Sequence, residues 1–525
     1  MKNKQSQTLQ PMKKFYIILA LIAICSTNVF SQAKVETKIS DKYSRNSVTK
    51  MYIAHNDNID NIVEQATSAF NFGEKYDYND IGISKISDKT SRGKTNTSDL
   101  TILLNQQNVA KSIVSFWLNR DAEGRMNDDK MRERSLYNVN DGEIMIAEAA
   151  KVSRIADMGD GLIKNSYIVI FDTEKVERKT STNKKTGKTT VTWNATTSAR
   201  VFNIMLDSTF IDDLYSNMWI QDDDNAEEKT AKKKRYDELQ LYMTPVAYVN
   251  CSSSSTVTQK NPEENAKRTS ILNSFDGLLD KMEKKIPQWQ VKVAIYDTNP
   301  IRSKIGTKEN LANGIRYRVY KYTEDQDGVL KMKPVGYVRA TEIAKNDSVA
   351  SGKSPTSRFY QIAGGHLEPG MLMRENKDKK IALSLGGKYH GANSAFLDID
   401  YLMHISNFGG CSYFMLGLGF DYRNAIYMDF NGGFGYGIPL TRWFELMPYA
   451  KIGADAMGHE KDENKDHSYS TLYAEGGARL SFQPIYPLRL FIQADYSLNF
   501  LEGNCYEVGD NRFGLGLSAG LRYAF

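Results

Sequence analysis

The fold is decided by the end of the chain, where residues 511–525 read NRFGLGLSAGLRYAF. One face of this stretch carries only apolar side chains: Phe513, Leu515, Leu517, Ala519, Leu521, Tyr523 and Phe525. The other face carries Arg512, Gly514, Gly516, Ser518, Gly520 and Arg522. Since successive side chains of a strand point to opposite faces, this period of two predicts a strand whose faces meet different surroundings.

The same alternation recurs in seven earlier segments after Lys380. Their apolar faces run from Leu383 and Leu385 in the first to Leu490 and Ile492 in the seventh, and no charged side chain falls on any of them. An Arg or Lys at the middle of a bilayer costs about 2 to 4 kcal/mol, so strands that face lipid need such a surface. The pattern therefore predicts an eight-stranded antiparallel transmembrane β-barrel over residues 380–525.

A secreted, soluble β-sandwich is the alternative, because its strands alternate too. Aromatic residues near the strand ends favour the membrane, where such rings collect at both interfaces. One predicted rim holds Tyr389, Tyr422, Tyr496 and Phe513, and the other holds Trp443, Phe444, Phe482 and Phe525.

Residues 380–525 resemble the small eight-stranded outer-membrane β-barrel families of Gram-negative bacteria, in strand spacing and in the terminal pattern Leu521, Tyr523, Phe525. The resemblance implies that this terminal pattern is a barrel-assembly signal recognised by the barrel assembly machinery. It also implies an outer-membrane location, contact with outer-membrane lipid, and barrel termini on the periplasmic side. It implies no activity.

Residues 1–33 read as a signal peptide. Lys13 and Lys14 precede the apolar run from Phe15 to Cys25, and cleavage after either Ser31 or Ala33 fits the small residues there. No later apolar run reaches the ~18 residues of a membrane helix. We therefore expect an exported chain without a helical membrane anchor.

Between signal and barrel, residues 34–98 are polar and are expected to be a mobile segment, whereas 99–372 read as a periplasmic α+β domain. Ser98 or Asp99 is the expected cap of a helix whose apolar stripe includes Val109 and Trp117. Helices are also expected over 141–155 and 270–286, and hairpins turn near 186–187 and 327–328. The order of elements over 105–218 is similar to that in periplasmic domains of secretion and surface-fibre assembly lipoproteins.

The sequence offers no catalytic, cofactor or metal site. Two Gly-Lys-Thr tripeptides, at 93–95 and 187–189, lack the leading glycine of a phosphate loop. The segment 325–328 lacks the terminal glutamate of a calcium loop. The histidines are scattered, and only His459 and His467 share an acidic loop, where adventitious metal binding is the alternative. A formal net charge of +5 is too small to indicate nucleic acid.

These observations predict a non-enzymatic outer-membrane protein whose barrel anchors a periplasmic interaction domain at the cell envelope, with its protein partner unknown. The alternative is a component of a secretion or surface-fibre assembly system that oligomerises through its periplasmic domain. A small barrel has a lumen just filled by side chains, so transport would need such oligomerisation.

Overall fold

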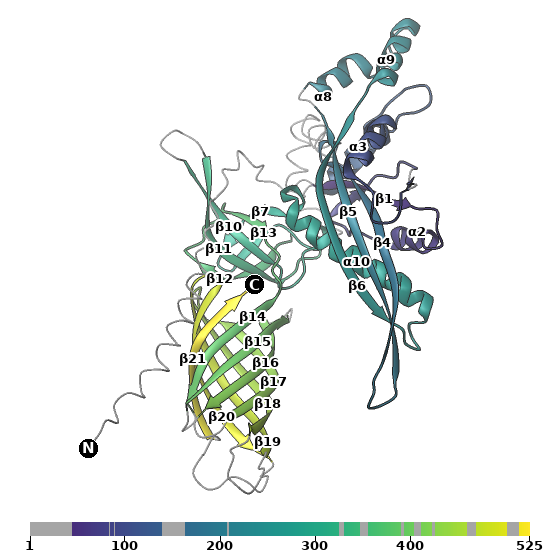
Figure 1. Cartoon of the computed structure of the whole chain (residues 1–525). Helices are drawn as coiled ribbons and strands as arrows, with labels where there is room; N and C mark the ends of the chain where they lie inside the picture. The colour runs from purple at the N-terminus through teal and green to yellow at the C-terminus, as the bar shows by residue number, and fades with distance from the viewer. Residues whose placement is uncertain are drawn as a thin grey trace, which may run out of the picture.

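The computed structural model describes residues 45–82, 84–88, 90–138, 163–206, 209–324, 330–346, 355–389, 393–403, 411–422, 426–458, 469–500 and 514–525. They form three units: a six-stranded sheet with helices, a seven-stranded sheet, and a closed barrel at the end of the chain (Figure 1). The predicted signal peptide, the predicted helix at 141–155 and the loop with His459 and His467 lie outside the described residues.

The first unit is a mixed sheet between two layers of helices. Its strands run in the order β2 (Tyr76–Tyr78), β1 (Asn46–Ala54), β4 (Ser166–Thr182), β5 (Thr189–Met205), β6 (Tyr242–Thr256), and β3 (Lys85–Ser87) also pairs with β1. The helices are α2 (Asp60–Ala69), α3 (Thr97–Gln106), α4 (Val109–Trp117), α5 (Asp129–Asn138), α8 (Phe210–Asp213), the π-helical turn η2 (Leu214–Met218), α9 (Ala226–Glu238) and α10 (Glu263–Lys285).

Strand alternation gives this sheet two cores. In β4, Ile168 and Ile170 face a cluster with α3, α4 and η2, whereas Val169 and Phe171 face a cluster with α2 and α10. A strand that is buried on both faces reads as a nearly continuous apolar run, as β4 does from its start.

Residues 45–98 fold, in contrast to the mobile segment that their polar composition suggested. β1 is buried along almost its whole length because it pairs in parallel with β2, β3 and β4. Its polar residues find partners there: Lys50 Nζ donates to the carbonyls of Ser68 and Phe70, at 3.0 and 2.8 Å, at the end of α2. Tertiary pairing, which composition does not reveal, orders this strand.

The outer edge of the first sheet is covered by lysines. β6 is an edge strand, and α10 packs against it. Lys281 Nζ donates to the Asn250 carbonyl at 2.5 Å, and Lys285 Nζ donates to the Tyr248 carbonyl at 2.9 Å. Two carbonyls of this edge strand therefore have side-chain partners.

Residues 99–372, which were predicted to be one α+β domain, belong to two units with separate sheets. The strands of the second unit run in the order β7 (Lys292–Ala294), β13 (Leu372–Glu375), β10 (Arg316–Glu324), β11 (Leu330–Glu342), β12 (Ser357–Gly364), β9 (Ile301–Ser303), β8 (Asp297–Thr298). A separate core lies within it, including Val319, Val338 and Phe359. A short 3₁₀ turn, η3 (Pro287–Trp289), follows α10 and leads into this unit.

The predicted β-barrel is present and closed. Its strands are β14 (Ile381–Tyr389), β15 (Asn393–Met403), β16 (Cys411–Tyr422), β17 (Ile426–Pro439), β18 (Phe444–Gly458), β19 (Tyr469–Ile485), β20 (Leu488–Asn499) and β21 (Gly514–Ala524). Neighbours pair antiparallel, and β21 returns to pair with β14 from Ala382↔Ala524 to Tyr389↔Leu517.

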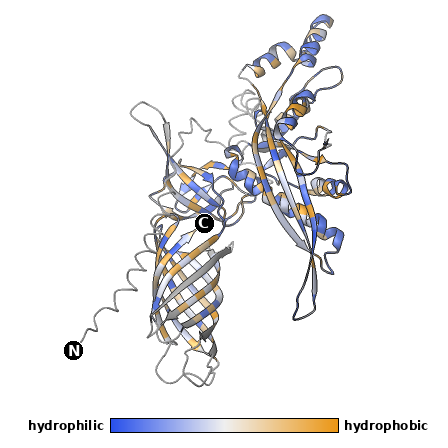
Figure 2. Ribbon diagram, in the orientation of Figure 1, coloured by the Kyte–Doolittle hydropathy of each residue, from blue (hydrophilic) through white to orange (hydrophobic). Residues whose placement is uncertain are grey.

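The barrel wall is apolar outside and polar inside. Ile492 and Leu515 on the outer face are 61% and 71% exposed, whereas Arg479 on the inner face is fully buried. Figure 2 shows orange, hydrophobic residues interspersed along the strands of this wall. Within the described residues, no helix is long and apolar enough to cross a membrane.

Candidate functional site

The barrel interior holds paired charges. Lys388 of β14 contacts the carboxylates of Glu475 on β19 and Asp495 on β20, the latter at 3.0 Å. Tyr449 of β18 donates its hydroxyl to Glu475 at 2.9 Å. Buried charges need such partners, because an unpaired one loses the hydration that water provided. These contacts cross the lumen from β14 to β19 and β20.

We call the end of the barrel that holds the C-terminus the mouth. A second cluster of charged and polar side chains lies nearer this mouth. Arg489 pairs with Glu445, and the Tyr413 hydroxyl donates to the same carboxylate at 3.0 Å. Arg489 Nε also donates to Gln483 Oε1 at 2.6 Å, and Arg522 Nη1 lies 3.9 Å from Glu445. Because Glu445 is held by a guanidinium and a hydroxyl, it is not a free general base.

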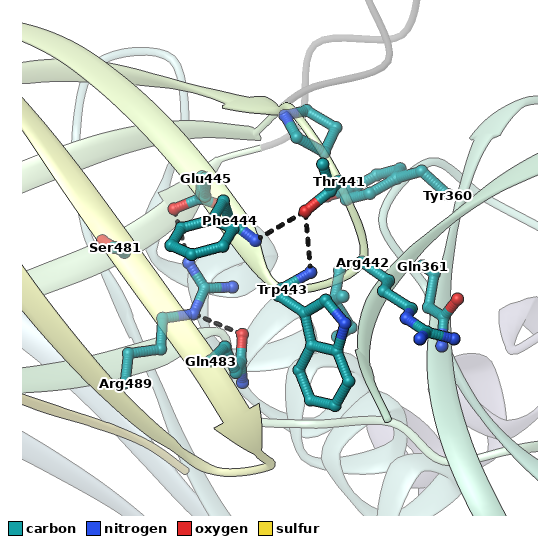
Figure 3. Close-up of a pocket in the computed structure, with 12 residues that line it drawn as sticks. Tyr360, Gln361, Thr441, Arg442, Trp443, Phe444, Glu445, Ser481, Gln483 and Arg489 are labelled. Atoms are coloured by element: carbon teal, nitrogen blue, oxygen red, sulfur yellow. Dashed lines mark hydrogen bonds and ion pairs between the residues drawn. The ribbon is translucent and has the colours of Figure 1, made fainter. Parts of the chain in front are cut away.

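The second unit covers this mouth with strand β12. Tyr360 of β12 packs against an inward cluster of Tyr413, Met415, Met447 and Tyr449 from the barrel. A pocket lies along this contact (Figure 3), lined by Tyr360, Gln361, Ile362, Pro439, Thr441, Arg442, Trp443, Phe444, Glu445, Ser481, Gln483 and Arg489. The pocket is thus shared between the second unit and the barrel.

The turn between β17 and β18 shapes one wall of the pocket. Thr441 Oγ1 accepts from the backbone N–H groups of Trp443 and Phe444, each at 3.2 Å (Figure 3). The carbonyl of Trp443 accepts from the Gln483 backbone N–H at 2.8 Å, which fixes this turn to β19. These hydrogen bonds hold the turn against β19.

A buried ion-pair cluster lies beside this contact. Arg316 of β10 lies over the ring of Tyr486, 4.4 Å from its centroid, at the turn between β19 and β20. Its Nη1 is 3.6 Å from Asp378, and Arg339 Nη2 of β11 is 2.7 Å from the same carboxylate. Tyr337 of β11 lies against Tyr486, with centroids 4.5 Å apart.

The cluster shifts the pKa of both partners. Burial lowers the pKa of Arg316 to about 10, against the pull of Asp378. Burial by itself would raise the pKa of Asp378, but the charges of Arg339 and Arg316 outweigh it and hold that pKa below its usual 3.8. Both groups are therefore charged at neutral pH.

A third cluster joins the first unit to the second. Lys75, beside β2, pairs with Glu283 of α10 and with Glu375 of β13, both at 2.9 Å. Lys377, in the linker to the barrel, pairs with Glu283 at 2.5 Å. Burial would raise the pKa of Glu283, but Lys75 and Lys377 lower it overall. Charged groups thus join the first unit, the second unit and the linker to the barrel.

The sequence-predicted signal residues lie on β21 or at its end, apart from the pocket. The Tyr523 and Phe525 rings are 4.9 Å apart, and Phe525 is 47% exposed. The Phe525 backbone N–H donates to the Ile381 carbonyl at 2.9 Å, and its carbonyl accepts from Lys379 N–H at 3.1 Å. Its side chain takes no part in these backbone contacts.

The other candidate motifs hold no ligand geometry that the structure describes. Gly93 and Gly187 both have positive φ, at 74° and 64°, as turn residues do. In the described ranges, no group of three or more His, Cys, Asp or Glu side chains is arranged to hold a metal. The segment 325–328 lies outside those ranges.

No family model matches the chain, and no curated protein matches it. Among solved structures, the N-terminal β-barrel domain of Pseudomonas aeruginosa OprF is 12% identical, covers 28% of this chain and 96% of its own, and has a TM-score of 0.22. The outer membrane protein Ail of Yersinia pestis is 15% identical, with 28% and 98% covered and a TM-score of 0.18. A major outer membrane protein from Thermus thermophilus is 13% identical, with 28% and 99% covered and a TM-score of 0.20. Similarity at this level carries no conclusion about what the chain does.

The Asp378 cluster predicts that the stability of the second unit is sensitive to acid. A folded-state pKa held below 3.8 adds stability that is present above the unfolded pKa and is lost as pH falls through the folded value. We expect Asp378→Asn to lower the urea midpoint of the second unit at pH ~6, since it leaves two arginines without a carboxylate. Below pH ~4 the difference between variant and wild type should shrink.

The matched control is Asp223→Asn, because Asp223 is exposed on the first unit and should leave the midpoint unchanged at either pH. An Asp378→Asn midpoint equal to that of wild type at neutral pH would show that this cluster does not stabilise the second unit.

Proposed function

We propose that this chain is a non-enzymatic outer-membrane protein whose barrel anchors a periplasmic interaction domain at the cell envelope. The observation that carries the proposal is the inverted polarity of the barrel wall. Apolar side chains face outward, with Ile452 and Leu515 each 71% exposed, while charged side chains are paired inside. A soluble protein rarely exposes a continuous apolar surface of this extent, whereas lipid requires one.

The location of the first two units follows from the barrel. Residues 376–380 connect the second unit to β14, and both ends of the barrel lie at its mouth because the strand number is even. In barrels of the bacterial outer membrane this end faces the periplasm. Both units would then lie in the periplasm, next to the periplasmic leaflet of the outer membrane.

An anchoring role is supported by the buried contacts between the units. Arg316 and Asp378 stabilise the second unit beside the barrel, and Lys75 with Glu283 and Glu375 connects it to the first unit. The ion pairs that cross the lumen between β14, β19 and β20 argue against passage of a solute through the barrel. The surface left for a partner is therefore that of the two folded units, chiefly the larger first unit.

Introducing a charged side chain on the outer face of the barrel tests whether this face meets lipid or water. We expect Ile492→Arg to destabilise the folded barrel by about 2 to 4 kcal/mol in lipid vesicles, because it places a cation in hydrocarbon. Ile102→Arg is the matched control, since Ile102 lies on α3 and is 55% exposed. That change should stay within about 0.5 kcal/mol.

The measurement is urea unfolding in vesicles, followed by the heat-dependent gel mobility of the folded barrel. Equal stability of the two variants would contradict the membrane-spanning barrel. A native mass of the wild-type protein that corresponds to a ring of several chains would instead favour the alternative, a component of a secretion or surface-fibre assembly system.

We further propose that Leu521, Tyr523 and Phe525 form the barrel-assembly signal read by the assembly machinery. Phe525→Ala should lower the amount of folded barrel in outer-membrane fractions, since the exposed ring is the part available for recognition. The purified variant should still refold in detergent, because the backbone hydrogen bonds of Phe525 with Ile381 and Lys379 remain. Only the contacts of the ring with Tyr523 and with Lys379 Nζ, 6.0 Å from its centroid, are lost.

Phe500→Ala is the control, as Phe500 follows β20 at the opposite rim and is 62% exposed. It should reach the outer membrane in wild-type amounts. If Phe525→Ala does so as well, the terminal aromatic residue is not the signal.

A further inference from the structure

The pocket between β12 and the barrel contains two polar side chains whose hydrogen-bonding capacity is unused. Ser481 and Gln483 of β19 line it, and they are only 1% and 3% exposed. Neither the Ser481 hydroxyl nor the Gln483 amide nitrogen has a hydrogen-bond partner among the described residues, although Gln483 Oε1 accepts from Arg489. Both groups can donate, and a buried polar group without a partner costs free energy. The site therefore favours a ligand that brings acceptor oxygens.

The pocket also contains a cation that the protein does not neutralise. Its ionisable lining residues are Arg442, Glu445 and Arg489. Glu445 and Arg489 pair with each other, and Arg522 Nη1 lies 3.9 Å from the same carboxylate. Arg442 has no ion-pair partner within the described part of the chain and lies over the ring of Trp443, 5.0 Å from its centroid. The lining therefore carries an unbalanced positive charge, which favours an anionic ligand.

The size of the pocket limits how much of a ligand it can hold. Figure 3 shows Gln483 and Arg489 on one side of the pocket, and Arg442 on the other side, where Gln361 of β12 lies. The space is about 260 Å³, including the part that is open to solvent. Pockets that enclose a whole small molecule measure roughly 300 to 1,000 Å³. The site thus fits a small anionic group whose remainder lies outside the pocket.

The pocket lies at the rim of the barrel, where a membrane interface is expected. Leu440 and Phe444, in and beside the turn between β17 and β18, are apolar and 54% and 40% exposed. The rings of Trp443 and Phe444 lie 6.3 and 5.2 Å from the ring of Phe482, so aromatic side chains collect at this rim. In transmembrane barrels such rings lie at the level of the lipid headgroups. Lipid headgroups are therefore the anions that this pocket would meet first.

We propose that this pocket binds the phosphate group of a phospholipid from the leaflet in which the barrel mouth lies. The inference rests on the proposed function for the position of that membrane. Arg442 pairs with the phosphate, because a guanidinium can hold two phosphate oxygens through parallel hydrogen bonds. Ser481 and Gln483 donate to oxygens of the same headgroup. The acyl chains lie outside the pocket, on the apolar outer face of the barrel.

Native mass spectrometry of the full-length protein in a maltoside detergent tests this site, because that detergent contains no phosphate. Phosphatidylglycerol is added in one series, and diacylglycerol with the same acyl chains in a parallel series. We expect phosphatidylglycerol to stay bound to the protein and diacylglycerol to be lost. Glycerophosphate, which has the phosphate but no acyl chains, should not displace the lipid at equal concentration. Displacement by glycerophosphate would show that the pocket takes a free phosphate ester, and would overturn a lipid as the ligand.

Three variants separate the pocket from general attraction at the mouth. Arg442→Gln should weaken phosphatidylglycerol binding by at least about ten-fold, since it removes the unpaired cation. Ser481→Ala should weaken binding by about five-fold. It should not lower the urea midpoint of the lipid-free protein, because it removes a hydroxyl that has no partner there. Lys379→Gln is the matched control, since it removes the same charge from an exposed residue of the linker at the mouth, outside the pocket lining. It should change binding by less than about two-fold.

The inference and the proposed function fail in different ways. Equal binding of phosphatidylglycerol by the wild type and Arg442→Gln would overturn the inference and leave the barrel untouched, and so would equal binding of diacylglycerol and phosphatidylglycerol. If the wild-type protein in detergent lacks the heat-dependent gel mobility of a folded barrel, the proposed function fails, and the inference with it.

Discussion

Everything in the last third of the chain depends on the pairing of β21 with β14. A strand that crosses hydrocarbon has no water to satisfy its N–H and C=O groups, so a sheet can stand there only if its two edges meet. The eight residue pairs between Ala382 and Tyr389 and their partners on β21 close that edge. Closure fixes which side chains face outward, and the inner residues are then confined to a narrow space. The pairing of Lys388 with Glu475 and Asp495 is a consequence of that confinement.

Buried charge also determines how the three units are arranged. Removing two ions from water is costly, and their attraction often does no more than offset that cost, so such pairs add little net stability. They do favour one geometry, because any displacement leaves a charge without its partner. Lys75 between two glutamates acts in this way between the first and second units, and Asp378 between two arginines holds the linker to the barrel against the second unit. The buried charges therefore favour one arrangement of the neighbouring parts.

The sequence predicted those parts of the fold in which local pattern decides the structure. The period of two predicted the barrel strands, and the apolar stripe from Val109 to Trp117 matches α4. The predicted ends of helices were less accurate. The helix expected to be capped by Ser98 or Asp99 is capped by Asn96. It is interrupted at Asn108, which has a positive φ of 48°. β1 was missed because Asn46, Ser47 and Thr49 are polar, and only pairing on both sides buries them. The contacts of Tyr360 and Arg316 with the barrel were missed too, since nothing local in a sequence marks partners that lie far away along the chain.

Two lysines of α10 affect how the edge of the first sheet can pair with another chain. An exposed edge strand as long as β6 is a template on which a second chain can add a strand, and that reaction leads to aggregation. Lys281 and Lys285 already occupy the carbonyls of Asn250 and Tyr248, and an incoming strand would have to displace both ammonium groups and bring its own backbone against them. The same helix that completes one core of the first unit thus also hinders strand addition at this edge.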